Sequence, residues 1–405
     1  MALSFPVGPV GTLPRTYPVT TLSDGEPPPV GSLREAITLA NLNPGADIVD
    51  LTGLSGTIVL TSGQIQISGP LRINGPGADV LAIDGNANSR IFSIYATDPA
   101  CPGLDGPDYL VAISGLRLTN ARRNVAGSNG GAIFTEHSLS LDGVLIDNNI
   151  ARGGAGVAMY VQYPGQVLTI TDSQFNSNTA TELLTATDTF PVAGGALYVV
   201  QRCANAQDVP YTQPVTVNIA NSEFRGNLVE PLTTHDGRGG AIRSYSLADI
   251  TIIDTIVSNN SVVAPTPLVA GYVHRGGGLE ITAKSLFVDG SEISDNSVLE
   301  SLGGDSTRGG GLMLANSSYD RQGPSGAMGA RIVNSTISGN AATASVGAIL
   351  VVGNVALELD NATVAGNVAA ATRTGGIARR AFSFVSRPAT SSRNRGFIRS
   401  PFVAS

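Results

Sequence analysis

Four arginines in this 405-residue chain share one position, directly before a glycine-rich stretch: Arg152, Arg238, Arg275 and Arg308. If those stretches are equivalent corners of stacked repeats, Arg238, Arg275 and Arg308 lie above one another. Stacked like charges repel, so they need acids, an anion or solvent between them. Guanidinium groups pair with carboxylates and sulfates through two parallel hydrogen bonds. The pattern therefore predicts either arginines paired with loop acids such as Asp236 and Asp305, or a stripe that binds a uronate or sulfated glycan.

A second row of side chains follows just after the glycine corners. Its members are Phe134, Tyr198, Arg243, Glu280, Met313 and Leu350. In a strand these positions point away from the core, so we expect a solvated, partly apolar strand face. The candidate ligand-binding residues are accordingly Arg238, Arg275, Arg308, Arg243, Glu280 and Tyr198.

The outward row does not supply the residues that polysaccharide cleavage requires. A hydrolase needs two facing acids, and a calcium-dependent lyase needs clustered carboxylates and a base. The row holds one charge pair, Arg243 beside Glu280, and adjacent repeats share no Asp-x-Asp cluster. Zinc-ligand spacing and a phosphate-binding glycine loop are also lacking. We therefore predict no catalytic residue, no metal site and no cofactor.

Three histidines lie close to charged residues in the sequence. His235 and His274 flank the arginine stripe, and His137 follows Glu136. We expect all three to be loop residues. The alternative is a carbohydrate-active enzyme, either a lyase or a hydrolase. Its site would lie nearest to Arg238, Arg275, His235, His274 and Glu280.

Two short motifs recur along the chain and must position these side chains. A glycine-rich motif appears at 130–133, 194–197, 239–242, 276–279, 309–312, 346–349 and 374–377. A motif that ends in asparagine follows each apolar alternation, at Asn149, Asn178, Asn227, Asn260, Asn296, Asn340 and Asn367. These asparagines are 27 to 49 residues apart, which fits a solenoid with loops and excludes a propeller of constant blade length.

The repeats predict a right-handed parallel β-helix. Short apolar alternations such as 215–219 cannot bury one face alone, but stacked ~4.8 Å apart they enclose an apolar column. Glycine pairs permit tight corners with positive φ and no Cβ clash. Asparagine tolerates left-handed backbone at a bend, and stacked asparagines hydrogen-bond in a ladder.

The chain divides into three parts. Residues 1–55 form an N-terminal segment with one strand near 17–22 and a helix over about 32–42, opened by the capping box Ser32 and Glu35. We expect this helix to cover the apolar end of the solenoid. The β-helix spans 56–377. Residues 378–405 form an irregular basic tail, which we interpret as a strand remnant or a frame-shifted end of a longer solenoid.

Composition bounds the structural class and the partners. With 42% hydrophobic residues, 49 glycines, few aromatics and no Trp, the core is a thin one of Val, Ile, Leu and Ala. The net charge of −7 argues against nucleic acid as a partner. The chain has no stretch long and apolar enough to span a bilayer. Residues 1–6 lack a basic region and an unbroken apolar run, so we expect no signal peptide.

The two cysteines lie in loop-like inserts. Cys101 and Cys203 follow equivalent strands about three rungs apart, which is roughly 14 Å at strand spacing. A disulfide requires Cα atoms within about 7 Å, so a bridge needs both loops to fold toward each other. Bridged and unbridged states both remain open at this point.

The motifs resemble those of known secreted proteins. The Gly-Gly-Ala-Ile and Phe-x-x-Asn pairs resemble the repeats of polymorphic outer-membrane proteins, a family of autotransported surface adhesins. Ser32-Leu33-Arg34-Glu35-Ala36 resembles the SLREA-type motif at the N-terminus of many secreted bacterial parallel β-helix proteins. Here Gly31 replaces the cysteine that usually precedes this motif, and the family's β-barrel translocator is not present. The resemblance implies a right-handed β-helix that is secreted or displayed at the cell surface.

Three functions are consistent with these observations. The first is a non-enzymatic surface or secreted protein that binds a glycan or another cell surface through one face and its loops. The second is the carbohydrate-active enzyme described above. The third is a structural fragment of a longer secreted solenoid. The sequence does not determine the oligomeric state.

Overall fold

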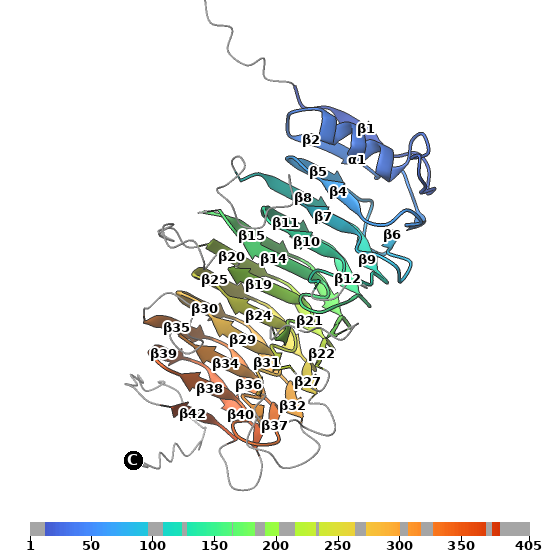
Figure 1. Cartoon of the computed structure of the whole chain (residues 1–405). Coiled ribbons are helices and arrows are strands. Elements are labelled where there is room, and N and C mark those ends of the chain that lie inside the picture. Colours follow the sequence, from blue (N-terminus) through green and yellow to red (C-terminus); the bar gives the residue numbers. More distant parts are fainter. Residues whose placement is uncertain are drawn as a thin grey trace, which may run out of the picture.

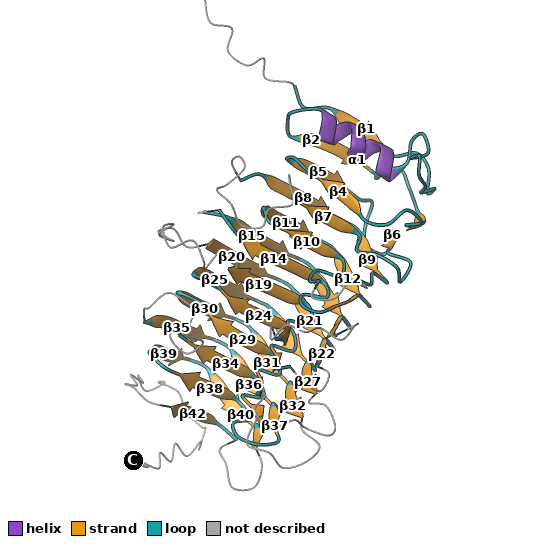
Figure 2. Ribbon diagram, viewed as in Figure 1, coloured by secondary structure: helices purple, strands orange, loops and turns teal. Residues whose placement is uncertain are grey.

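The computed structural model describes residues 13–95, 108–123, 128–163, 165–182, 191–201, 215–231, 235–263, 273–299, 307–316, 327–369 and 375–380. In these ranges the chain is a right-handed parallel β-helix, which confirms the predicted fold (Figure 1). Strands stack along one axis from the N-terminal helix to the C-terminal coil, and the helix lies at one end of the stack (Figure 2). Cys101, Cys203, Asp305 and the tail from residue 381 lie outside the described residues.

Three long parallel sheets form the walls of the solenoid. Sheet A contains, in order, β1 (Thr16–Pro18), β2 (Asp47–Asp50), β5 (Leu71–Asn74), β8 (Leu110–Ser114), β11 (Ser138–Asp142), β15 (Val167–Thr171), β20 (Val215–Ala220), β25 (Ala248–Ile253), β30 (Ser285–Asp289), β35 (Met328–Val333) and β39 (Val355–Asp360). Sheet B contains β3 (Gly56–Val59), β6 (Leu81–Asp84), β9 (Arg117–Thr119), β12 (Leu145–Asp147), β16 (Gln174–Asn176), β21 (Glu223–Arg225), β26 (Ile256–Ser258), β31 (Glu292–Ser294), β36 (Thr336–Ser338) and β40 (Thr363–Ala365).

Sheet C is the third wall. It contains β4 (Ile65–Ile67), β7 (Phe92–Ile94), β10 (Ile133–Thr135), β14 (Val157–Val161), β19 (Leu197–Gln201), β24 (Ile242–Tyr245), β29 (Leu279–Thr282), β34 (Leu312–Ala315), β38 (Ile349–Val352) and β42 (Ile377–Arg380). The last strand pairs with β38 through Arg380, so regular structure continues past the predicted end at residue 377. At the other end, β1 and β2 enter sheet A before residue 56, the predicted start of the β-helix.

Two shorter sheets were not expected from the sequence. Sheet D contains β13 (Ile150–Ala151), β17 (Thr179–Thr181), β22 (Leu228–Glu230), β27 (Ser261–Val263), β32 (Ser297–Leu299), β37 (Ala341–Ala342) and β41 (Val368–Ala369). Sheet E contains β18 (Val192–Ala193), β23 (Gly237–Arg238), β28 (His274–Arg275) and β33 (Thr307–Arg308). Valines from both sheets form a small apolar cluster of their own, separate from the main core. A central coil therefore passes through five strands, in the order A, B, D, E, C.

The main core is the apolar column enclosed by sheets A, B and C. Strand β25 shows its origin, because Ala248, Ile250 and Ile252 are buried while the residues between them are partly exposed. Equivalent side chains stack from coil to coil: the rings of Phe175 and Phe224 are parallel, with centroids 4.7 Å apart. Alternation of period two thus becomes a continuous column, because each strand buries one face only.

Polar ladders hold two corners of the coil. Between sheets B and D, the seven predicted asparagines lie in one file, and each side-chain amide donates to the next asparagine's Oδ1 at 2.9 to 3.0 Å. Between sheets A and B, buried hydroxyls accept the backbone N–H of the preceding coil, at Ser173, Ser222, Thr255, Ser291 and Ser335. The recurrent Asn/Asp-Ser pair was the signal for this second ladder.

The glycine corners need glycine for two different reasons. Gly239 has φ of 63°, in the left-handed region, and Gly240 lies where a Cβ would press against the carbonyl oxygen of Gly277 in the next coil. The first glycine permits the turn, and the second permits the close stacking of successive coils.

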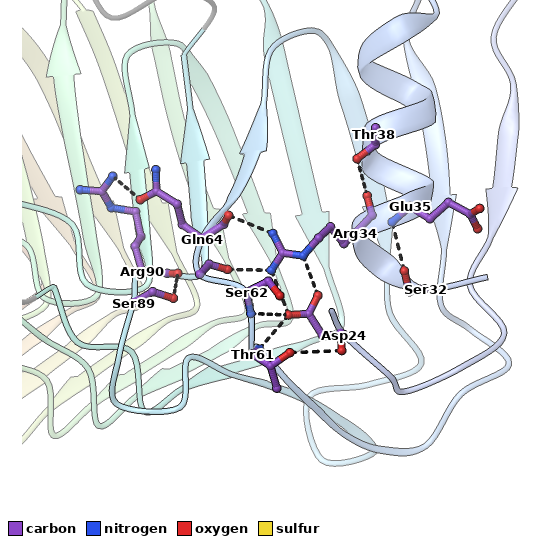
Figure 3. Close-up of polar contacts among 11 residues, drawn as sticks. Asp24, Ser32, Arg34, Glu35, Thr38, Thr61, Ser62, Gln64, Ser89 and Arg90 are labelled. Carbon is purple, nitrogen blue, oxygen red and sulfur yellow. Dashed lines mark hydrogen bonds and ion pairs between the residues drawn. The ribbon is translucent and has the colours of Figure 1, made fainter. Parts of the chain in front are cut away.

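The helix α1 (Leu33–Leu42) covers the N-terminal end of the column. Ser32 caps it by accepting the Glu35 N–H at 3.1 Å, and Leu33 and Ile37 are buried against the core. Arg34 of the helix pairs with Asp24 at 2.7 Å and donates to the carbonyls of Gly63 and Gln64 (Figure 3). The expected capping helix is thus fastened to the first coil by a buried ion pair.

Candidate functional site

Three arginines stack in register on sheet E. Arg238 of β23 pairs with Arg275 of β28, which pairs in turn with Arg308 of β33. We call these three residues, the stripe of the sequence analysis, the arginine file. The sequence places these three correctly. Arg152 is not part of the file, because Gly153 pairs with Ala193, the residue in register with Arg238. The turn in that coil is made by Gly154, with φ of 55°, so the corner lies one residue later than the sequence pattern indicates.

The outward row of sheet C runs beside this file. Tyr198 pairs with Arg243, Arg243 with Glu280, Glu280 with Met313, and Met313 with Leu350. Ala158 also belongs to the row, between Phe134 and Tyr198. The sequence analysis omitted it, because the corner in register in its coil reads Gly154-Ala155-Gly156-Val157 and departs from the glycine motif of the other coils. The strands therefore bring Tyr198, Arg243 and Glu280 together on three consecutive coils.

The row is not the solvated strand face that we expected. Arg243 is 4% exposed and Glu280 2%, while Met313 is fully buried. Sheet E contributes to the burial of Glu280, because the Arg238 guanidinium lies 3.8 Å from the Glu280 carboxylate. The sequence analysis did not foresee sheet E, whose strands precede the glycine corners and contact the outward row at Glu280.

The acid that accompanies the arginine file is Asp236. It accepts hydrogen bonds from the Arg238 guanidinium and the Val273 N–H, both at 2.7 Å. Burial by itself would raise the pKa of Asp236, but the charges of Arg238 and Arg275 and these hydrogen bonds hold it below its usual value. Asp236 therefore supplies the negative charge that the sequence assigned to it, while Asp305 lies outside the described residues.

His274 is a buried strand residue and not the loop residue that we predicted. It belongs to β28, is fully buried, and its Nδ1 accepts the Gly237 N–H at 3.1 Å. Burial lowers its pKa to about 4, with Asp236 opposing and Arg275 reinforcing the shift. Because Nδ1 is an acceptor, the neutral ring carries its proton on Nε2.

The other two histidines each lie against a carboxylate. Nδ1 of His235 contacts Oε1 of Glu182, and both side chains are buried. Nδ1 of His137 lies 3.3 Å from Asp108, and its ring stacks between those of Tyr109 and Tyr163. The structure thus separates His137 from the arginine file and keeps His235 and His274 near it.

Arg243 and Glu280 have polar atoms that the fold does not satisfy. In the described part of the chain, Nε and Nη1 of Arg243 and Oε2 of Glu280 are buried without a hydrogen-bond partner. The guanidinium lies 5.4 Å from the Tyr198 ring centre and 5.6 Å from that of Tyr245. These rings hold the cation by its flat faces. The N–H donors lie in the plane of the group, and those of Nε and Nη1 remain unsatisfied.

An aromatic row that the sequence analysis did not identify lies beside Arg243. Tyr160, Val200 and Tyr245 are in register on the same face of sheet C, two residues along each strand, and are half-buried. Tyr160 and Tyr245 are two strands apart, about 10 Å at strand spacing. This aromatic row could have been found in the sequence, because its members occupy the second outward-facing position after each glycine corner. The site thus combines buried charges with partly accessible aromatic rings, a composition typical of ligand sites.

No family model, curated protein or solved structure matches the chain. The described residues contain no cluster of His, Cys, Asp or Glu arranged to hold a metal ion. Within the same ranges, the model has no helix with the length and apolar character needed to cross a bilayer.

Proposed function

We propose that this protein is a non-enzymatic, secreted or surface-displayed β-helix that binds a glycan through the outward face of sheet C and the adjoining arginine file. The observation that carries the proposal is the register of Tyr198, Arg243 and Glu280 on three consecutive coils, beside Arg238 and the half-buried Tyr245. Aromatic faces and a few fixed polar groups are what a sugar-binding surface needs, since a sugar presents both apolar and hydroxyl surface.

The rigidity of the scaffold supports a binding role. Each coil is fixed to its neighbours by strand pairing and by the asparagine and hydroxyl ladders, so the side chains of sheet C keep their spacing. A preformed surface loses little entropy on binding, which favours affinity for a repeating polymer.

Extracellular placement is the second part of the proposal. Its support is the resemblance of the Ser32-to-Ala36 motif and the glycine and asparagine repeats to those of secreted and surface proteins. Protease treatment of intact producing cells tests it: the chain should be degraded while cytoplasmic markers stay intact. Recovery of the whole chain with the cytoplasmic markers would refute this part.

A screen of the purified chain against a polysaccharide array tests the binding role. We expect binding to at least one glycan, weakened by Arg275→Ala and unchanged by Arg331→Ala, because Arg331 is an exposed arginine on sheet A with Glu358 and Asp360 as partners. An equal loss of glycan binding in both variants would show that the arginine file is not part of the binding site. The same mixtures are analysed for shortened chains, and their appearance would show the protein to be an enzyme.

A further inference from the structure

Arg243 and Glu280 are neighbours in register, yet in the described structure they do not form an ion pair. They lie on adjacent strands β24 and β29, and both are more than nine-tenths buried. Arg243 directs its guanidinium at the rings of Tyr198 and Tyr245, while Glu280 contacts Arg238 through Oε1. The donors Nε and Nη1 of Arg243 and the acceptor Oε2 of Glu280 therefore remain without partners on neighbouring strands.

The chemistry of these atoms restricts what can satisfy them. A buried donor or acceptor without a partner is unfavourable, so a ligand that pairs with both sets gains from each. A sulfate or carboxylate accepts from Arg243 but presents only lone pairs to Oε2 of Glu280. A hydroxyl group accepts and donates, so two adjacent hydroxyls can pair with the arginine and the glutamate together.

The carboxylate of Glu280 points the same way. The arginines of this region outnumber its acids, but Glu280 is the in-register neighbour of Arg243 and contacts Arg238. An anion that accepts from Arg243 would therefore lie close to this carboxylate in a poorly hydrated region, where like charges repel strongly. A neutral ligand avoids this cost.

We infer that Arg243 and Glu280 bind two adjacent hydroxyl groups of an uncharged sugar ring, which packs against Tyr245. One hydroxyl oxygen accepts from the Arg243 guanidinium, and the other hydroxyl donates to Oε2 of Glu280. Tyr245 lies on the same strand as Arg243, is half-buried, and its ring centre is 5.6 Å from that guanidinium, so it supplies a partly exposed apolar face beside the arginine. This inference rests on the proposed glycan-binding function and names the class of sugar.

The test compares neutral and anionic probes on the full chain. The neutral probes are gluco-, manno- and galacto-hexaoses, and the anionic probes are polygalacturonate and dextran sulfate. We expect one neutral hexaose to bind equally at low and high salt, because its contacts do not depend on net charge. Arg243→Gln and Glu280→Gln should each weaken that binding by about tenfold or more. Arg331→Gln, the exposed control on sheet A, should leave it unchanged.

Each outcome decides between the claims. Binding of the anionic polymers alone, abolished by salt, would overturn the neutral-sugar inference and leave the glycan-binding function standing. Failure of every probe, neutral and anionic, would refute both. Circular dichroism and thermal unfolding establish that the variants fold. If Arg243→Gln or Glu280→Gln does not fold, the test uses Tyr245→Leu, because Tyr245 is only half-buried. Weakened hexaose binding by this variant supports the inference, and unchanged binding overturns it.

Discussion

The side-chain amide of Asn227 donates to Oδ1 of Asn260 at 2.9 Å, and the same oxygen accepts the backbone N–H of Asn227 at 2.9 Å. The amide of Asn260 also donates to the carbonyl of Phe224 in the coil before. One buried side chain therefore satisfies two donors of the neighbouring corner and one backbone acceptor. This arrangement is repeated from Asn149 to Asn367.

Asn260→Ala is expected to destabilise the protein by about 3 kcal/mol or more. The substitution leaves two buried N–H groups of Asn227 without an acceptor: the backbone N–H, and the side-chain N–H that does not donate to Phe175. Each such group costs about 1 to 3 kcal/mol. Urea unfolding of the purified variant measures the change.

The neighbouring residue provides the control for that experiment. Asn259 is exposed with φ of 56°, so Asn259→Gly keeps the left-handed corner and should change the stability by a few tenths of a kcal/mol. Equal effects at the two positions would show that the ladder adds nothing beyond the turn.

Gly240→Ala should disrupt the stacking of coils, because the new methyl group would press on the carbonyl of Gly277. We expect a loss of about 1 to 3 kcal/mol from backbone displacement. The matched substitution is Gly329→Ala in β35, where a Cβ has no neighbour within 4 Å. Thermal unfolding should separate the two variants, and an unchanged midpoint for Gly240→Ala would contradict the proposed role of the second corner glycine.

Arg34→Met should loosen the N-terminal cap. It leaves the Asp24 carboxylate without its buried partner, which costs about 3 kcal/mol. Arg72→Met on the exposed face of β5 is the control and should cost less than about 0.5 kcal/mol. Proteolysis near the N-terminus, followed by mass spectrometry, should be faster in Arg34→Met and normal in Arg72→Met.

The same ion pair predicts a dependence on pH. Burial alone would raise the pKa of Asp24, but the hydrogen bonds from Arg34, Thr61 and Ser62 and the charge of Arg34 lower it overall. The folded pKa is thus below the unfolded value of 3.8, so this contribution is complete above that value and is lost as the pH falls through the folded pKa. Arg34→Met should reduce this acid-dependent loss, and an identical pH profile in both proteins would argue against it.

His274 predicts a second dependence on pH, at higher values. Its pKa falls from 6.5 to about 4 on folding, chiefly by burial, so between these values the unfolded chain binds more protons. Stability is therefore complete above pH 6.5 and decreases toward pH 4, by on the order of 1 to 3 kcal/mol. In His274→Asn, Oδ1 of the new side chain can accept the Gly237 N–H without titrating. Urea unfolding between these two pH values should show a flatter profile in that variant; a slope equal to that of the parent would rule His274 out.

Much of the architecture was predictable because its causes are local and repeated. Apolar alternation, corner glycines and bend asparagines recur through the central and C-terminal coils. The parallel β-helix, the file from Asn149 to Asn367 and the register of Arg238, Arg275 and Arg308 therefore follow from counting positions. The helix after Ser32 was equally predictable, since its cap and apolar face lie within a few residues of each other.

The environment of the candidate site was decided by the tertiary structure. Whether Arg243 and Glu280 face water depends on how the chain travels between the asparagine corner and the glycine corner, where the sequence has no common period. Sheets D and E form there, and sheet E places Arg238 beside Glu280 and contains the buried His274. A repeated motif predicts the structure of the residues next to it in the chain. Burial and charge pairing, in contrast, depend on segments far apart in sequence. For that reason the sequence pattern determined the β-helix, and only the folded chain decided which buried polar atoms have no hydrogen-bond partner.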